Sequence, residues 1–172
     1  MGAALRWHVN DAAVRRHCDW PGLDDAWLAA AGADGSLHWI DGGRDGASAD
    51  ERVALALDRA TLVLRGRWLH TRNGRPQGLI SRCLPARAGA ADLEPAAIAA
   101  LLARAGPHAA RTWQRASVGT ADAALAQRLQ LAAGAPLLCL RQLRHAADGR
   151  PIESRDAVWC AESAHLLMEL WR

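Results

Sequence analysis

Hydrophobic and polar positions follow two different periods along this 172-residue chain. Near-alternation, which is typical of a strand with one buried face, covers residues 36–41, 61–70, 76–84, 111–118, 137–145 and 151–159. Apolar residues spaced three and four positions apart, which is typical of an amphipathic helix, cover residues 23–31, 48–59, 93–105, 121–133 and 162–171. The order of these segments predicts an α+β domain in which helices flank an antiparallel sheet.

Capping signals predict where the helices begin. Ser48 followed by Glu51 is a capping box, so we expect the helix 48–59 to start there and to place Val53 and Leu57 against the sheet. The next helix is expected to have Asp92 as its N-cap and Ile98, Leu101 and Leu102 among its apolar inward-facing positions. The helix after it is expected to have Thr120 as its N-cap and Leu125 and Leu129 at those positions.

Glycine-containing segments predict the turns. Asn73-Gly74 is a strong hairpin signal between the strands 61–70 and 76–84, and Asp148-Gly149 predicts a second hairpin between 137–145 and 151–159. Residues 42–46 contain three glycines, and we expect them to form a loop after the first strand.

The two hairpins belong to an internal repeat. Ser48-Ala49-Asp50 reappears as Thr120-Ala121-Asp122, an offset of 72 residues, and Gly74-Arg75-Pro76 reappears as Gly149-Arg150-Pro151, an offset of 75. The second offset exceeds the first by three residues, which predicts a three-residue insertion near residues 134–136. We interpret the repeat as a duplication, in which two helix–strand–hairpin halves share one sheet and leave a ligand cleft between them.

Composition is that of a single globular domain. The chain has 21 basic and 18 acidic residues, and every basic residue is Arg, because the sequence contains no Lys. These arginines are scattered rather than clustered, so their number reflects GC-rich codon usage and does not indicate a nucleic-acid surface. No segment is apolar enough to span a bilayer, and the opening residues lack a signal-peptide pattern. We therefore expect a cytoplasmic protein without membrane contact.

Sequence motifs for catalysis or metal binding are missing. The four cysteines include no CxxC pair, and no His/Cys cluster has zinc-site spacing, so we expect neither a metal nor another cofactor. The sequence also lacks a nucleophile elbow, a phosphate-binding loop and a dinucleotide fingerprint. It therefore identifies no catalytic residue.

The return strand of the second hairpin carries the first candidate ligand-binding residues. A period of two places Glu153, Arg155 and Trp159 on one face of that strand. Arg can bind an anion through two hydrogen bonds, Glu accepts from hydroxyl or amide groups, and Trp stacks on rings. Such a strip suits a polar ring-shaped or anionic small molecule. The alternative is a surface salt bridge between Glu153 and Arg155 beside a core Trp.

The outgoing strand of the first hairpin offers two faces. Arg65 and Arg67 share one face and would form an anion clamp if that face is inside. Trp68 and His70 share the other face and would line the cleft if the arginines face solvent. Periodicity alone does not choose between these two arrangements.

From about residue 36 to residue 171 the chain resembles the UTRA domain, the effector-binding half of GntR-type regulators of the HutC group, whose fold is that of chorismate lyase. The resemblance is carried, in order, by ERVALALD, TLVLRGRWLHTRNGRP, SRCLPA, LEPAAIAALLARAG, TADAALAQRLQLAAGAPLLCLRQLRHAADGRPIE and AVW. It implies an N-terminal helical extension over residues 1–35 and a ligand-binding domain over residues 36–172.

The resemblance also assigns residues. It places the family's effector-binding Glu at Glu153 and its aromatic residue, six positions later, at Trp159. The family's usual pair of ligand-binding arginines aligns with Trp68 and His70, a departure that argues against a phosphosugar-like effector.

The function implied is that of a small-molecule sensor in transcription regulation, acting as a homodimer. Only about 35 residues precede the first strand, too few for a winged helix, so we expect DNA contact only through a module outside this chain. The alternative is a chorismate pyruvate-lyase, which would use Arg65 or Arg67 for the substrate carboxylates and Glu153 near the leaving group. A third possibility is a scaffold domain that binds nothing. Effector binding is the interpretation that we favour.

Overall fold

A computed structural model of the chain describes residues 35–86, 94–104 and 109–163. Its elements, in chain order, are β1 (Gly35–Gly46), α3 (Ala49–Leu55), β2 (Leu62–Arg72), β3 (Arg75–Pro85), α4 (Pro95–Arg104), β4 (Arg111–Thr120), α5 (Ala123–Leu129), β5 (Pro136–His145), β6 (Pro151–Cys160) and the short 3-10 helix η1 (Ala161–Ser163). The helix expected at 23–31, most of the one at 162–171, and the expected N-cap Asp92 lie outside the described residues.

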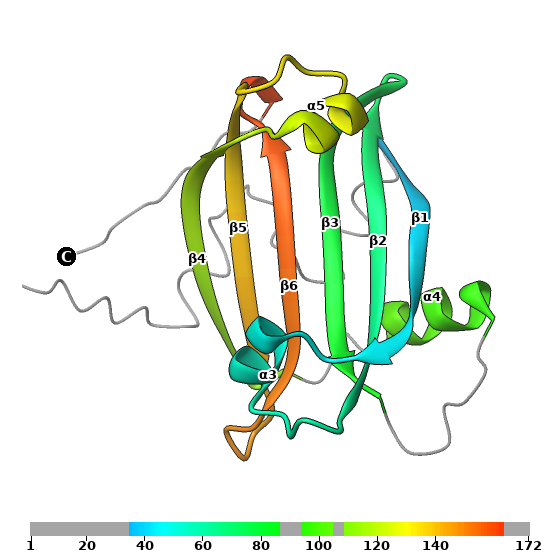
Figure 1. Cartoon of the computed structure of the whole chain (residues 1–172), viewed down its shortest axis with the longest axis vertical. Coiled ribbons are helices and arrows are strands. Elements are labelled where there is room, and N and C mark those ends of the chain that lie inside the picture. The colour runs from blue at the N-terminus through cyan, green and yellow to red at the C-terminus, as the bar shows by residue number, and fades with distance from the viewer. Residues whose placement is uncertain (1–34, 87–93, 105–108, 164–172) are drawn as a thin grey trace, which may run out of the picture.

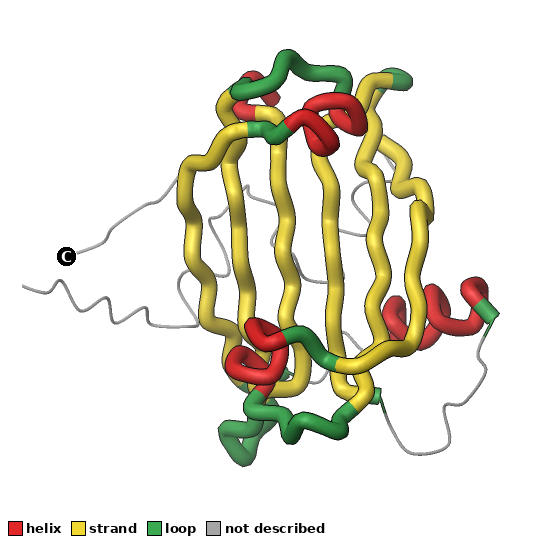
Figure 2. Tube along the Cα trace, in the orientation of Figure 1, coloured by secondary structure: helices red, strands yellow, loops and turns green. Residues whose placement is uncertain are grey.

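All six strands form one antiparallel sheet in the order β1-β2-β3-β6-β5-β4 (Figures 1 and 2). The hairpins β2–β3 and β5–β6 therefore meet at the centre, where β3 pairs with β6, and β1 and β4 form the two edges. The α+β class and the antiparallel sheet predicted from the sequence are confirmed.

The sheet consists of two halves with the same element order, β1-α3-β2-β3 and β4-α5-β5-β6. Three equivalent pairs of positions are each 74 residues apart: the N-caps Ser48 and Asp122, the left-handed C-caps Ala56 and Gln130, and the strand starts Leu62 and Pro136. The offset becomes 75 at the second turn, where Gly74 and Gly149 both have positive φ. The three-residue insertion expected near 134–136 is therefore wrong, because the two helices align 74 rather than 72 residues apart.

Helix α3 begins as predicted and ends earlier. The Ser48 side chain accepts from the Glu51 N–H, and Glu51 in turn accepts from the Ser48 N–H, so the capping box is complete. The helix stops at Leu55, because the next residue adopts a left-handed conformation. Leu55 is the buried residue of the helix, whereas Val53 is 85% exposed, so its predicted contact with the sheet is wrong.

Helix α5 is capped by Asp122, whose side chain accepts from the Leu125 N–H at 2.8 Å. Thr120, the expected cap, is the last residue of β4. Asp122 is the N-cap in place of Thr120 because it directly precedes the first helical residue, so its carboxylate reaches the free N–H groups of the first turn.

Strand β1 is longer than its sequence pattern indicates. Residues 42–46 continue the pairing with β2, so the loop expected there is wrong. The glycines are accommodated in the strand because the neighbouring strand supplies backbone hydrogen bonds, and a side chain at Gly42 would collide with the ring of Trp39.

The two faces of the sheet are covered by different helices. Helix α4 packs on the face that carries Glu153, hereafter the Glu153 face, where Ile98 and Leu102 contact Leu64 and Trp68. The predicted inward position Leu101 is 41% exposed.

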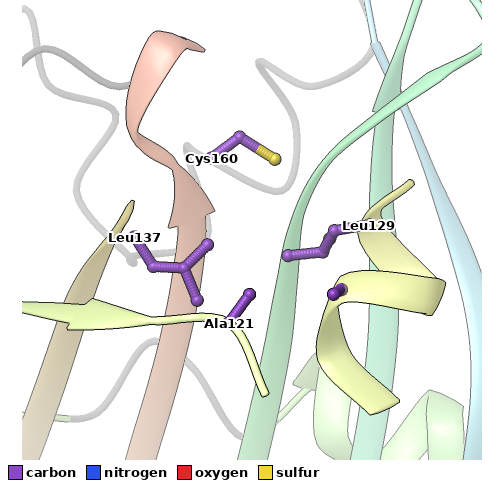
Figure 3. Packing of buried hydrophobic residues seen from close by; sticks show 5 residues of the cluster. Ala121, Leu129, Leu137 and Cys160 are labelled. Atoms are coloured by element: carbon purple, nitrogen blue, oxygen red, sulfur yellow. The ribbon is translucent and has the colours of Figure 1, made fainter. Parts of the chain in front are cut away.

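Helices α3 and α5 lie at opposite ends of the other face, which carries Arg65 and is called the Arg65 face (Figure 1). Leu129 of α5 packs there with Ala121, Leu137 and Cys160 (Figure 3). Among the described elements, α4 thus lies against β1 and β2 on one face, and α3 and α5 lie against the central strands β3 and β6 on the other.

The indole rings of Trp39, Trp68 and Trp159 lie on the Glu153 face, each against a glycine of its own or an adjacent strand. A Cβ added to Gly66 would come within 2.6 Å of the Trp68 ring and 2.5 Å of Leu102, and one added to Gly78 within 2.6 Å of Trp159. Trp39 and Trp68 also contact each other edge to face, with centroids 5.0 Å apart. Glycine at these positions therefore makes room for the aromatic layer.

The variant Gly66→Ala is expected to lower the free energy of unfolding by about 1–3 kcal/mol, because the added methyl group overpacks the contact with Leu102 and Trp68. Gly43→Ala is the matched control in β1, since no atom lies within 4 Å of its added Cβ. Urea unfolding should show a lower midpoint for Gly66→Ala only, and equal midpoints for the two variants would contradict this account of the glycine.

Candidate functional site

The side chain of Glu153 is surrounded by three arginines from three strands. Arg82 of β3 donates from Nε to Oε1 of Glu153 at 2.5 Å, and Arg144 of β5 donates from Nη1 to Oε2 at 2.8 Å. Arg155, two residues along β6, donates from Nε and Nη2 to the two oxygens at 2.8 and 3.0 Å. Neighbouring strands in register place these groups on one face, since Arg82 lies opposite Arg155 and Arg144 opposite Glu153.

This cluster, Glu153 with Arg82, Arg144 and Arg155, is buried. Glu153 is 1% exposed, and none of the three arginines exceeds 6%. Burial acts to raise the pKa of Glu153, but the hydrogen bond from Arg155 and the charge of Arg82 outweigh it, so that pKa lies below its ordinary value. The carboxylate is ionised at neutral pH, so Glu153 is a counter-charge that all three guanidinium groups share.

Next to the charged cluster, the Glu153 face becomes aromatic and apolar. Trp159 lies four residues beyond Arg155 on β6, and its ring meets that of His70 edge to face, with centroids 5.3 Å apart. Burial and the nearby charge of Arg72 hold the pKa of His70 below its ordinary value, so the imidazole is neutral at pH 7. Ile80, Leu140 and Ala157 are the buried residues between the two ends.

The structure brings together five of the seven residues singled out from the sequence: Glu153, Arg155, Trp159, Trp68 and His70 share one face of the sheet. The surface salt bridge considered for Glu153 and Arg155 does not describe them, because both side chains are buried.

Arg65 and Arg67 lie on the opposite face, each in an ion pair. Arg65 donates to both carboxylate oxygens of Glu51, from Nε at 2.6 Å and from Nη2 at 2.5 Å. Arg67 holds Asp41 in the same two-bond manner, with Nε 2.6 Å from Oδ1. The arrangement with Trp68 and His70 on the face of Glu153 is thus the one observed, and Arg65 and Arg67 do not join the cluster.

Arg82 and Arg144 were missed from the sequence. Arg82 carries a recognisable signal, because it stands between the apolar alternate positions Ile80 and Leu84. The signal at Arg144 is weaker, because the alternate position before it is the polar Gln142. A basic residue on the buried face of a central strand needs a partner, and the acidic residue on the adjacent strand supplies it.

Known proteins resemble this chain over most of its length. The family model described as the UTRA domain matches residues 30–165. The chain belongs to the UTRA domain family. No curated protein sequence matches it.

Solved structures resemble this UTRA domain in fold. The effector domain of PhnF from Mycobacterium smegmatis is 20% identical and has a TM-score of 0.71, with 86% of this chain and 94% of that one covered. The C-terminal domain of the histidine utilization repressor from Pseudomonas syringae is 16% identical, with a TM-score of 0.65 and coverage of 80% and 99%. A GntR-family transcriptional regulator from Enterococcus faecalis is 17% identical, with a TM-score of 0.63 and coverage of 79% and 98%.

Membership of the UTRA domain family supports an effector-binding regulatory domain. The same matches give no support to the chorismate pyruvate-lyase alternative. In the part of the chain that the structure describes, no helix is long and apolar enough to cross a membrane. Within those residues, too, no group of three or more His, Cys, Asp or Glu could hold a metal ion.

Removal of the buried carboxylate should be costly. We expect Glu153→Gln to lower the free energy of unfolding by about 3–5 kcal/mol, because three buried guanidinium groups lose their shared counter-charge. Asp156→Asn on the same strand is the control, since its pair with Arg141 is about half exposed and should contribute no more than about 1 kcal/mol. Chemical denaturation of both variants measures the difference, and similar losses would argue against a special role for the buried cluster.

The Glu51–Arg65 pair predicts a pH dependence of stability. The hydrogen bond from Arg65 lowers the pKa of Glu51 from 4.5 to about 2, against the opposing effect of burial. The unfolded chain therefore binds more protons than the folded one between these values, so the stabilisation is complete above about pH 4.5 and is lost as the pH falls towards 2. Glu51→Gln should flatten the stability curve in that window, and an unchanged slope would contradict the assignment.

Proposed function

We propose that the effector of this UTRA domain is a small organic anion that binds on the Glu153 face, with its charged group at the buried arginines. The observation that carries the proposal is the concentration of guanidinium groups on this face: Arg82, Arg144 and Arg155 all contact the carboxylate of Glu153. Guanidinium groups bind carboxylates and similar anions through short charge-assisted hydrogen bonds, so three of them on one face provide donors that suit an anionic ligand group.

The rest of the face suits the remainder of such a ligand. Beyond the arginines, the Glu153 face carries Trp159, His70 and Trp68, and the rings of these residues provide flat surfaces on which a ligand can stack. An effector with a carboxylate or similar anion at one end and a ring or short apolar body at the other would satisfy both regions. Glu153 would then accept hydrogen bonds from polar groups of the ligand or yield an arginine to it.

Regulation would follow from a change in how the two halves of the sheet pack. The cluster joins β3 of one half to β5 and β6 of the other, so a ligand that competes for these arginines alters contacts across the centre of the sheet. We further propose that the chain acts in the cytoplasm as a homodimer and controls transcription together with a DNA-binding module. The effector would favour one arrangement of the dimer over another.

Calorimetric titration with small organic acids, each paired with its neutral amide, tests the ligand class. Binding is expected for at least one acid and to be lost for its amide. Arg144→Gln should weaken that binding by about tenfold to a hundredfold, the range for one hydrogen bond to a charged group.

Arg67→Gln provides the matched control, because Arg67 lies on the opposite face and pairs with Asp41. Its affinity should equal that of the unaltered chain. Equal binding by Arg144→Gln, or preference for the amide over the acid, would refute an anion site at the buried cluster.

A further inference from the structure

Strand β4 is an open edge of the sheet. Within the residues that the structure describes, it pairs with β5 on one side only, and nine of its ten residues are exposed. Two of them are large and apolar: Trp113 is 45% exposed and Val118 is 83% exposed. The pairing with β5 runs through the whole strand without a bulge, and the strand contains no proline.

The opposite edge is protected in ways that β4 is not. Strand β1 has a bulge between Trp39 and Asp41, and α4 packs beside it with Trp39 in its apolar cluster. Bulges, prolines, covering helices and charged side chains are the usual means of preventing an edge strand from pairing with another chain. Within the described residues β4 has only the charges of Arg111 and Arg115, so its backbone is open to pairing with a partner that accommodates those two arginines.

We propose that β4 pairs with β4 of a second copy of this chain, antiparallel, about a two-fold axis at Ala116. This inference rests on the proposed homodimer and specifies its interface. The two-fold axis is normal to the sheet, so equivalent faces of the two copies lie on the same side. Each residue before the axis then pairs with the residue of the other copy that lies equally far beyond it. With the axis at Ala116, residues 112–120 of the two copies overlap.

The self-complementarity of the strand supports this register. Arg115 of each copy lies opposite Ser117 of the other, whereas an axis at Arg115 would place the two Arg115 side chains against each other. Trp113 lies opposite Gly119, which repeats between copies the arrangement of Trp159 directly opposite Gly78 within the subunit. A large side chain thus meets a small one on each side of the axis.

This interface would also be connected to the effector cluster. Gln114 of β4 accepts from Nε2 of the buried Gln142 at 2.6 Å, and Gln142 lies directly opposite Arg155 in the pairing of β5 with β6. The edge strand is therefore one hydrogen-bonded residue away from the arginines. A rearrangement at the cluster would reach β4 through this pair of amides.

Charge substitution at Ser117 tests the register. Sedimentation equilibrium of the full chain measures the dimer dissociation constant without any effector. Ser117→Arg places two arginine pairs across the axis and should weaken the dimer by about tenfold, whereas Ser117→Glu creates two Arg–Glu pairs and should strengthen it. The double variant Arg115→Glu with Ser117→Arg should restore the affinity to within about twofold of the original, and Ser117→Ala is the neutral control.

Cross-linking gives an independent reading that does not depend on charge. Ala116→Cys should form a disulfide-linked dimer under mild oxidation, because the axis brings the two positions together, and Ser117→Cys should do so much less. A monomeric chain, the same dissociation constant for Ser117→Arg and Ser117→Glu, or equal cross-linking at both positions would overturn the proposal. Calorimetry on Ser117→Arg reports effector binding separately, so a failed interface is distinguishable from a failed effector site.

Discussion

One buried carboxylate organises the centre of this domain. Glu153 receives hydrogen bonds from arginines on β3, β5 and its own strand β6, and thereby connects the two halves of the sheet at the line where they meet. In the low-dielectric interior these bonds are strong and their loss is expensive. Under the proposed function, the anionic group of the effector competes with Glu153 for the same arginines, so ligand binding and the stability of the sheet would depend on one set of side chains.

The matching element order of the two halves explains how the cluster is assembled. Each half contributes a hairpin, and the symmetric strand order places both hairpins at the centre and the first strand of each half at an edge. The equivalent positions then diverge: Ile80 of β3 corresponds to Arg155 of β6, and Gly78 corresponds to Glu153. These two positions are small or apolar in β3 and charged in β6, while Arg82 brings a charge from β3 to the same cluster.

Local signals in the sequence predicted much of this fold. The capping box at Ser48, the turns at Gly74 and Gly149 and the alternation in β6 depend on nearby residues, and the family resemblance added the connection between them. The errors arose where distant residues decide. Residues 42–46 remain in a strand because β2 pairs with them, and Val53 faces solvent because α3 packs on the sheet through Leu55. The arginines missed at the cluster lie on strands other than that of Glu153, so strand register was needed to place them.

Strand β6 is buried from both directions, and this limits how the family can vary. Glu153 and Arg155 face one side, while Val158 and Cys160 pack towards α5 on the other. Because side chains alternate between the faces, inserting or deleting one residue ahead of Glu153 within β6 would move Glu153 and Arg155 to the face covered by α5. Val158 and Cys160 would then point towards Arg82 and Arg144. A change of length is therefore tolerated in the turns that flank β6 and not within the strand, whereas a replacement at one position alters the ligand face without disturbing the other.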